Sequence, residues 1–589
     1  MRLPKDPTPE ELRAVLNASL RGAFAVHDEP PAELQYQSSF LTGSEVLGVP
    51  VPPQTIRGWF RHLSWNQTFK QVACVAAALK SDGVIGDCQK QLKQGLATAP
   101  RPHPFVAMVG LGVAPHVESR RPIVHEQVLY SILQIAAEEC ANEGGRDPSP
   151  LEIALFALVI NDHLDRGYTN FQTEMDAFAS SISLSARFNH ARDGLRSIVR
   201  SASIFLDPLP ASAELSRYPD IWESVQQRAF GSYGLAGFMN LFAIPLAMFA
   251  ETHWGPSSLP SLRISDWYKN AAEVAAAAET WIAPMTTTRD ELRAASNGDT
   301  IPAASPLLLR KPFVEFDGEH WAATPWSVLR QLHTGVRMRL LDASKSVGSR
   351  VANMWQAAHG FMVEGWCQQV ARWAKESSRC PASVVVPDVP GDEDLDDIVI
   401  TVGETSMLFS VKSRLMRERE AFNLSARTGI VDWYEEFLFD KQKGRFREGA
   451  ARLLDAKVRA VRAGTTAVPK DNVIVPILVM YDEPLENVGL IDWWTRRCVE
   501  EELFRQSLPP IIINIDTFES LMSLLAEGED IGRLLRKRQS ETWRRQRMDT
   551  FLATIIPNWG RLRLPDIQRR FDRIGADSLQ ALKDIAHID

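Results

Sequence analysis

The chain has 589 residues, enough for roughly two to four folded domains of about 100–200 residues each. Hydrophobic residues make up 45% and charged residues 23%, proportions that exclude a disordered chain and are typical of a globular protein. The 65 Lys and Arg residues against 73 Asp and Glu residues give a net charge of −8. This balance excludes a protein that is basic over its whole surface, but not one with a locally basic groove.

Six scattered cysteines form no CxxC pair, and no histidine lies near them at metal-ligand spacing. The pattern excludes a zinc ribbon and a dense disulfide framework, and it favours a reducing compartment. The first residues also lack the basic and then apolar pattern of a signal sequence. We therefore expect a cytoplasmic protein.

Residues 1–300 have mostly helical patterns, clearest at 127–142, 151–164 and 268–282. The 22 residues from 229 to 250 carry no charge, but three glycines and Pro245 interrupt them. We interpret this stretch as a buried core helix and expect no membrane span. Because no chemical motif stands out in residues 1–300, we assign them to a sensor or partner-binding region, with a protein partner or an activating ligand.

A polar, turn-rich stretch at 285–306 marks the main predicted domain boundary. In the connector, residues 301–350, two short apolar runs flank Asp317 and Gly318, the dipeptide that favours a type I′ β-hairpin turn. A helical pattern follows at 325–341.

From residue 351 the pattern changes to alternating helices and strands, which predicts an α/β domain over 351–530. Helices are expected at 351–377, 432–463 and 493–506. Strands are expected at 383–386, 397–402, 407–412, 473–480 and 511–515. A basic helical segment, 531–589, ends the chain. The fold class is thus α+β multidomain, with a mostly helical N-terminal region before an α/β core.

Three residues lie at key points of this core. Glu364 is in the first helix, Asp397 precedes an apolar strand, and Lys412 ends the next strand. In this order the sequence resembles the PD-(D/E)xK nuclease superfamily over about residues 351–515. The resemblance implies a restriction-endonuclease-like core in which Glu364 and Asp397 hold Mg²⁺ (or Mn²⁺) and Lys412 takes part in catalysis.

The residue types suit phosphodiester cleavage independently of the resemblance. A hard cation such as Mg²⁺ prefers oxygen ligands, and it neutralises phosphate charge and activates water. Side chains alternate along a strand, so positions 410 and 412 face the same side. Lys412 can therefore lie beside a metal ligand and support the attacking water or the phosphate.

Position 410 departs from the family pattern, because Ser410 stands where the family has Asp or Glu. The missing acid can come from Glu404, Glu435 or Glu436, or the site can work with Asp397 and Glu364 alone while Ser410 holds a metal-bound water. In the third alternative the site is silent and the fold serves only for binding. Taken singly, each site residue is also compatible with a solvated helix, loop or strand end. Their joint order favours retained activity.

Basic residues cluster after the strand expected at 407–412. Between 441 and 462 there are eight basic residues and two acids, and between 533 and 547 seven basic residues and one acid. Such runs attract phosphate backbones, although a solvated helix face has the same composition. The candidate nucleic-acid-binding residues are Arg414, Arg417, Lys441, Gln442, Lys443 and Arg445.

These observations predict a metal-dependent nuclease acting on DNA, with RNA as the other substrate. Large helical regions fused to such nucleases resemble bacterial anti-phage or restriction effectors. Two alternatives stay open: a catalytically silent nuclease fold that binds nucleic acid, and a protein-interaction subunit of a defence complex.

Overall fold

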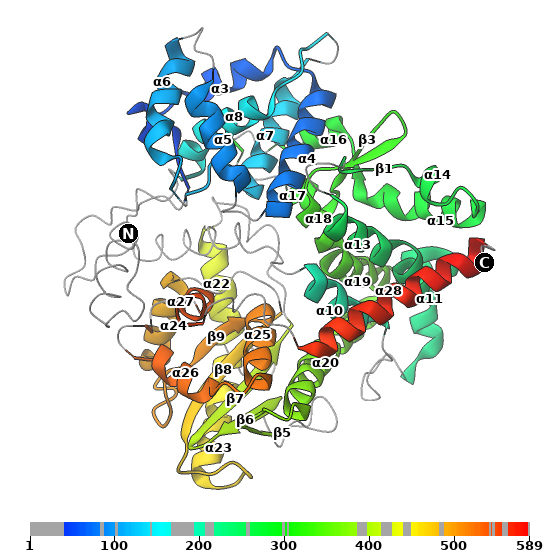
Figure 1. Ribbon diagram of the computed structural model, residues 1–589. Coiled ribbons are helices and arrows are strands. Elements are labelled where there is room, and N and C mark those ends of the chain that lie inside the picture. Colours follow the sequence, from blue (N-terminus) through cyan, green and yellow to red (C-terminus); the bar gives the residue numbers. More distant parts are fainter. Residues whose placement is uncertain are drawn as a thin grey trace. The chain divides into compact units, whose positions relative to one another are not determined.

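The computed structural model describes the following residues: 40–82, 87–99, 104–119, 121–141, 144–165, 194–206, 217–254, 259–296, 301–302, 306–385, 397–413, 427–439, 449–481, 488–540, 543–544, 548–556 and 564–586. They form two compact units (Figure 1). The smaller unit comprises Met1–Ala177 and Arg289–Ser305, and the larger comprises Phe178–Thr288 and Pro306–Asp589.

Two divisions, after Thr288 and after Ser305, fall within the turn-rich stretch 285–306, but a third, after Ala177, was not expected from composition. Helix α10 (Gly194–Leu206) packs against helices from the second half of the chain, α20 (Ser349–Glu376) and α28 (Pro565–Ala586). The larger unit therefore contains helices that composition alone places in the N-terminal region. The connector at 301–350 is likewise divided between the two units.

The smaller unit is helical throughout its described part. Its helices are α2 (Gly43–Leu47), α3 (Pro53–Phe60), α4 (Trp65–Asp82), α5 (Asp87–Thr98), α6 (Pro104–Val113), η1 (Ala114–His116), α7 (Glu126–Glu139), α8 (Pro150–Asp165) and α16 (Arg289–Ala294). Helices α7 and α8 are apolar over most of their length and form the core. Helices α2, α3, α4, α5 and α16 pack on one or both of them, whereas α6 packs on α2 and α5.

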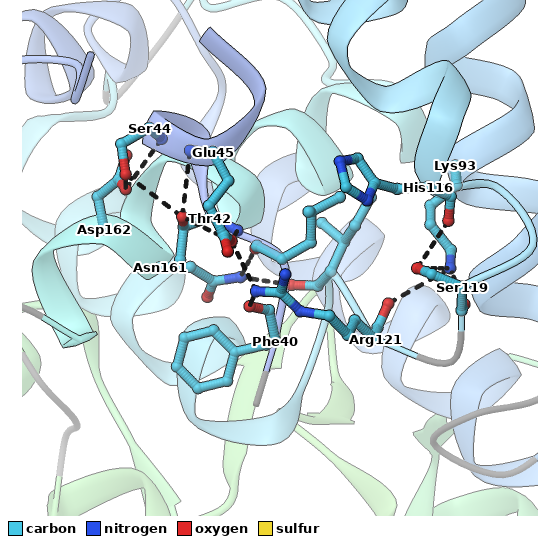
Figure 2. A network of polar contacts seen from close by, with 12 residues as sticks. Phe40, Thr42, Ser44, Glu45, Lys93, His116, Ser119, Arg121, Asn161 and Asp162 are labelled. Carbon is cyan, nitrogen blue, oxygen red and sulfur yellow. Dashed lines mark hydrogen bonds and ion pairs between the residues drawn. The ribbon is translucent and has the colours of Figure 1, made fainter. Parts of the chain in front are cut away.

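A polar network fixes the start of this unit (Figure 2). The guanidinium group of Arg121 donates hydrogen bonds to the carbonyl oxygen of Phe40 and to the carboxylate of Glu45, both at 2.6 Å. The carboxylate of Asp162 accepts a hydrogen bond from the N–H of Ser44 at 2.9 Å. The hydrogen bond between Ser44 and Asp162 therefore attaches the short helix α2 to α8.

The larger unit contains a helical part with a small sheet. Its helices are α10, α11 (Pro219–Phe230), η4 (Gly231–Tyr233), α12 (Gly234–Phe238), η5 (Met239–Ala243), α13 (Ile244–Thr252), α14 (Ile264–Trp267), α15 (Ala272–Ile282), η6 (Ala283–Met285), α17 (Pro306–Arg310), α18 (Pro325–Arg330), η7 (Gln331–Gly335), α19 (Val336–Val347) and α28. The sheet has the order β1-β4-β3-β2 and consists of β1 (Ser261–Leu262), β2 (Thr286–Thr287), β3 (Phe313–Phe316) and β4 (Glu319–Ala322).

The predicted hairpin is confirmed. Strands β3 and β4 pair antiparallel, and both Asp317 and Gly318 have positive φ, 55° and 75°, as a type I′ turn requires. Within the described part of the chain, the helical stretch Pro219–Thr252 is long and apolar enough to cross a membrane, and 56% of its most apolar window is buried. Length and composition do not separate such a stretch from the core helix of a soluble protein.

The second sheet carries the predicted chemistry. Its strands are β5 (Ser383–Val385), β6 (Ile398–Val402), β7 (Thr405–Lys412), β8 (Val473–Met480) and β9 (Ile511–Asn514), in that spatial order. Strands β5, β6 and β7 form an antiparallel meander, and β7, β8 and β9 are parallel. The accompanying helices are α20, α22 (Arg427–Leu438), α23 (Ala450–Ala463), α24 (Val488–Glu500), α25 (Ile515–Ala526), α26 (Ile531–Arg538) and α27 (Met548–Ile555).

Helices cover both faces of this sheet. Helices α20 and α25 pack together and against the sheet, with Phe518 of α25 in ring contact with Phe409 of β7. On the other face, residues of α22, α23 and α24 form an apolar core with Val399, Leu408 and Leu478. The chain is thus mostly helical with two small mixed sheets, which confirms the predicted α+β class. The single helix expected at 432–463 is described as two, α22 and α23.

Candidate functional site

The open end of the β6–β7 hairpin brings the predicted residues together. Ile398 pairs with Phe409, so Asp397, one step earlier, lies opposite Ser410. Lys412 is the last residue of β7. Fifteen residues of chain separate Asp397 from Lys412, and the hairpin returns them to the same edge of the sheet.

The Asp397 side chain is held by the backbone of β7. One of its carboxylate oxygens, Oδ2, accepts a hydrogen bond from the N–H of Val411, the residue between Ser410 and Lys412. The other oxygen, Oδ1, makes no hydrogen bond to any residue that the structure describes. The carboxylate is therefore oriented at the strand end while one oxygen stays available.

Glu364 reaches the same place from helix α20. Its carboxylate accepts a hydrogen bond from the side-chain amide of Gln368, one helical turn later, at 3.0 Å. The same amide also donates to the carbonyl oxygen of Asp397 at 3.3 Å. Gln368 is fully buried and Glu364 is 9% exposed, so this amide ties the helix acid to the strand acid.

The side chains of Ser410 and Lys412 lie on the face of the sheet opposite to the one on which α20, the helix of Glu364, packs. Alternation along β7 places both side chains on the face of Leu408, which α22 and α23 cover, whereas α20 packs on the other face. Ser410 is 6% exposed and Lys412 is half-buried. The strand end is anchored, because the carbonyl of Lys412 accepts a hydrogen bond from the N–H of Tyr481 at 2.9 Å.

None of the three acids considered as replacements joins this site. Glu404 is exposed in the β6–β7 turn, at the other end of the hairpin from Asp397. Glu435 of α22 forms an ion pair with Arg497 at 2.8 Å. Glu436, also on α22, is half-buried. Within the described ranges, no group of three His, Cys, Asp or Glu side chains lies close enough to hold a metal ion.

The residues present still suit Mg²⁺ in one respect. Mg²⁺ keeps several water ligands and is commonly bound through one or two carboxylates together with substrate phosphates. Asp397, with one oxygen available, and Glu364 beside it are two such carboxylates. Any cation here would depend on the substrate to complete its ligands.

A buried ion cluster lies in the same part of the sheet, and motif reasoning missed it. Arg200 of α10 contacts Asp516 at 2.5 Å and Glu519 at 3.4 Å, both on α25. The indole N–H of Trp366, two residues after Glu364, donates to Glu519 at 2.8 Å. These ion pairs and this hydrogen bond therefore join helices α10, α20 and α25.

Burial shapes the acid–base properties of this cluster. It raises the pKa of the fully buried Glu519 to about 7, although Arg200 acts in the opposite direction. Burial alone would lower the pKa of Arg200, but Asp516 and Glu519 together raise it above its ordinary value. Arg200 lies nearer to Asp516 than to Glu519, and burial favours the uncharged form of the Glu519 carboxyl group.

Two histidines adjoin the cluster, the buried His359 and the half-buried His333. The ring of Tyr481, directly after β8, contacts the rings of His359 and His333 at 5.4 and 6.4 Å between centroids. Burial, with Arg200 and Arg330 nearby, lowers the pKa of His333 to about 3. Burial likewise lowers the pKa of His359 well below its usual range. Both rings are uncharged at neutral pH.

The ends of three strands give a signal that could have indicated part of this cluster. Strands β7, β8 and β9 are parallel, and such strands present their carboxyl ends at the same edge of a sheet, where ligands of α/β proteins commonly bind. Lys412, Tyr481 and Asp516 lie at or directly after those ends. Arg200 and Glu519 have no comparable local signal, because only the packing of α10 on α25 pairs them.

The predicted nucleic-acid contacts lie outside the residues that the structure describes. These are Arg414, Arg417, Lys441, Gln442, Lys443 and Arg445. Farther along the same basic run, Arg452 pairs with Glu501 and Arg459 with Asp455, while Arg462 donates to backbone carbonyls. These three arginines thus have structural partners.

The second basic run includes helix α26, which lies near the first residue of β7 and not near its last residue, Lys412. In α26, Arg533, Arg536 and Lys537 are exposed. However, Gly532 of this helix lies against Thr405, the first residue of β7. A strand of eight residues at about 3.3 Å per residue puts roughly 23 Å between Thr405 and Lys412. This basic surface therefore lies near the end of β7 that is farthest from Lys412.

Taken together, the described residues place two carboxylates, a lysine and a serine at the edge of a mixed sheet, backed by a buried ion cluster. The carboxylates are held by hydrogen bonds that fix their orientation, as a cation or phosphate site requires. No family model, curated protein or solved structure matches this chain.

Proposed function

We propose that the protein is a metal-dependent nuclease acting on DNA, with Asp397, Glu364 and Lys412 as its active-site residues. One observation carries the proposal: the carboxylate of Asp397 accepts the N–H of Val411, while Gln368 ties Glu364 to the Asp397 backbone. The two acids are therefore linked to each other at the end of β7, the strand whose last residue is Lys412.

The order of elements supports this proposal. A helix, an antiparallel three-stranded meander, further helices and a strand parallel to the third is the arrangement of the restriction-endonuclease-like core. Here those elements are α20, β5–β7, α22 with α23, and β8. Acids on the first helix and before the second strand, and a lysine at the end of the third, occupy the positions that the resemblance implies.

Each residue has a role that its position supports. Mg²⁺ or Mn²⁺, when bound, supplies charge neutralisation and an activated water. Asp397 and Glu364 would hold such a cation through their carboxylate oxygens. Lys412 places a positive charge at the strand end, where it stabilises the charge that develops on the phosphate. Ser410, opposite Asp397, donates a hydrogen bond to a water molecule in the site.

The smaller unit fits a regulatory role in this proposal. It is compact and helical, and it contributes none of the active-site residues. We therefore place the sensor or partner-binding function there, as in effectors of the restriction or anti-phage type.

The second candidate function is a silent nuclease fold that binds nucleic acid. It is favoured by Ser410 at the acid position and by the absence, among the described residues, of a third metal ligand near Asp397. Such a protein would bind polyanions in a salt-dependent way and cleave nothing.

Cleavage of plasmid DNA, single-stranded DNA and RNA by the purified full-length chain tests the proposal. Each substrate is incubated with Mg²⁺, Mn²⁺ or EDTA, and binding is measured in parallel in EDTA at low and high salt. Asp397→Asn preserves the shape of the side chain. Glu404→Gln is the matched control, because it removes an acid from the same hairpin at its other end.

The proposal predicts cleavage of DNA with either cation, none with EDTA, and a loss of about 100-fold or more in Asp397→Asn only. Salt-dependent binding without cleavage, equal in all variants, would establish the silent fold instead. Neither binding nor cleavage would leave a protein-interaction subunit as the better account.

A further inference from the structure

The smaller unit contains a cavity of about 790 Å³ between α2, α3, α6 and α8. Cavities that bind small organic molecules commonly measure about 300–1,000 Å³. Its apolar lining includes Trp59, Phe105, Met108 and Phe156. It lies in a different unit from Asp397, so nothing about the proposed nuclease site accounts for it.

The walls of this cavity are held in place by specific contacts. The polar network in Figure 2 ties α2 to α8 through Ser44 and Asp162. Helix α6 lies so close to α2 that a Cβ atom on Gly112 would come within 2.1 Å of the carbonyl oxygen of Val46. Backbone hydrogen bonds join Arg146 to His62 and Ser64 at 2.9 Å. The cavity is therefore preformed rather than created by a loosely packed loop.

The lining selects for flat apolar groups. The ring of Trp59 lies 5.3 Å from that of Phe105 and 6.2 Å from that of Phe156, the latter nearly parallel at 27°. Aromatic rings prefer such offset contacts with a further ring. At the mouth, Val49 and Met108 are 66% and 54% exposed, which is unusual for apolar side chains that line a cavity. A bound molecule would cover both.

The charged residues of the lining do not call for a charged ligand. Arg146 and Glu152 form a two-point ion pair with each other, at 2.5 and 3.0 Å. Their charges therefore compensate within the wall. Thr55 and His62 supply the remaining polar groups, which suit a single hydrogen-bonding substituent.

We propose that this cavity binds a planar, uncharged aromatic molecule with one polar substituent. The site takes the ring system against the wall that Trp59, Phe105 and Phe156 form, and it takes the polar substituent at Thr55 or His62. It would make the smaller unit a small-molecule sensor, and it does not depend on the chain being a nuclease.

Titration of the full-length protein with the neutral planar dye Nile red tests the site. Met108→Trp fills the mouth of the cavity with a larger side chain. Leu111→Trp is the matched control, because Leu111 lies on the same helix, is 62% exposed and does not line the cavity. Melting curves of both variants establish that they fold as the wild type does.

The expected result is saturable binding of one dye per chain, weakened at least tenfold by Met108→Trp and unchanged by Leu111→Trp. Non-saturable binding, or equal affinity in wild type and Met108→Trp, would overturn the proposal. Loss of binding in both variants would also overturn it, since the dye would then occupy the outer apolar surface of α6, as a protein-docking face would.

Discussion

At the scale of single residues, the Asp397 carboxylate is oriented by a peptide N–H rather than by a cationic side chain. A neutral donor fixes the direction of the carboxylate without neutralising its charge, so the remaining oxygen keeps its affinity for a cation. Ser410 lies opposite Asp397, and its hydroxyl group supplies no second negative charge for binding a cation.

Placing a carboxylate at position 410 tests whether a cation binds beside Asp397. We expect Ser410→Asp to lower the free energy of unfolding in EDTA by about 1–3 kcal/mol, because a carboxylate is buried beside Asp397. Mn²⁺ should restore that loss, and thermal unfolding with and without Mn²⁺ measures both effects.

The control is Ser406→Asp. Ser406 is buried on the same face of β7, but it bonds to Asn472 at 2.9 Å near the turn end. It should lose stability with no recovery in Mn²⁺. An equal response of both variants to Mn²⁺ would mean that position 410 is not beside a cation site.

Gln368 is the second residue with a definite consequence. Its amide donates to both Glu364 and the carbonyl of Asp397, so Gln368→Leu removes a donor from one buried and one half-buried acceptor. We expect a loss of about 1–3 kcal/mol in the free energy of unfolding, measured by urea denaturation. An unchanged free energy of unfolding in Gln368→Leu would show that water replaces the amide.

At the scale of elements, Arg200 links α10 to α25 through ion pairs with Asp516 and Glu519. The pKa of Glu519 is raised to about 7 by burial, above its value of 4.5 in an unfolded chain. A carboxyl group with a raised pKa stabilises the fold fully below its unfolded pKa, and this contribution is lost as pH rises through the folded pKa.

We therefore predict that the free energy of unfolding falls between pH 5 and pH 8 by an amount that Glu519→Gln removes. Gln keeps an oxygen for the indole N–H of Trp366, so the packing is preserved. Urea denaturation of both proteins across this range is the measurement. Parallel pH profiles would contradict a raised pKa of Glu519.

The sequence predicts the strands of the second sheet better than the surroundings of the site. Strands β6, β7 and β8 were predictable to within two residues, because each is a short apolar run between turn or polar residues. The same hairpin brings Asp397 opposite Ser410. Arg200 and Glu519 were not predictable, because 319 residues separate them and no local pattern pairs two such distant helices.

At the scale of the whole molecule, the two units do not follow the composition of the chain. Helix α10 precedes the turn-rich boundary but packs with α20 and α28. A boundary read from composition marks where the chain is polar, and a unit is decided by which apolar faces are buried together. That distinction has a direct experimental consequence.

We expect a fragment of residues 306–589 to unfold without cooperativity, whereas a fragment of residues 178–589 melts cooperatively. The shorter fragment lacks Arg200, so Asp516 and Glu519 lose their cationic partner, and one-sided removal from a buried ion pair costs about 3–5 kcal/mol. Circular dichroism melting curves of both fragments measure this. A cooperative transition in the shorter fragment would show that α10 is dispensable.

The most direct test of the central claim is the single-turnover cleavage rate of DNA in Mn²⁺, with protein in excess. Lys412→Met is compared with Lys470→Met, a substitution of an exposed lysine between α23 and β8. The account predicts metal-dependent cleavage that falls about 100-fold or more in Lys412→Met and is unchanged in Lys470→Met. Equal rates in the two variants, or cleavage that persists in EDTA, would contradict it.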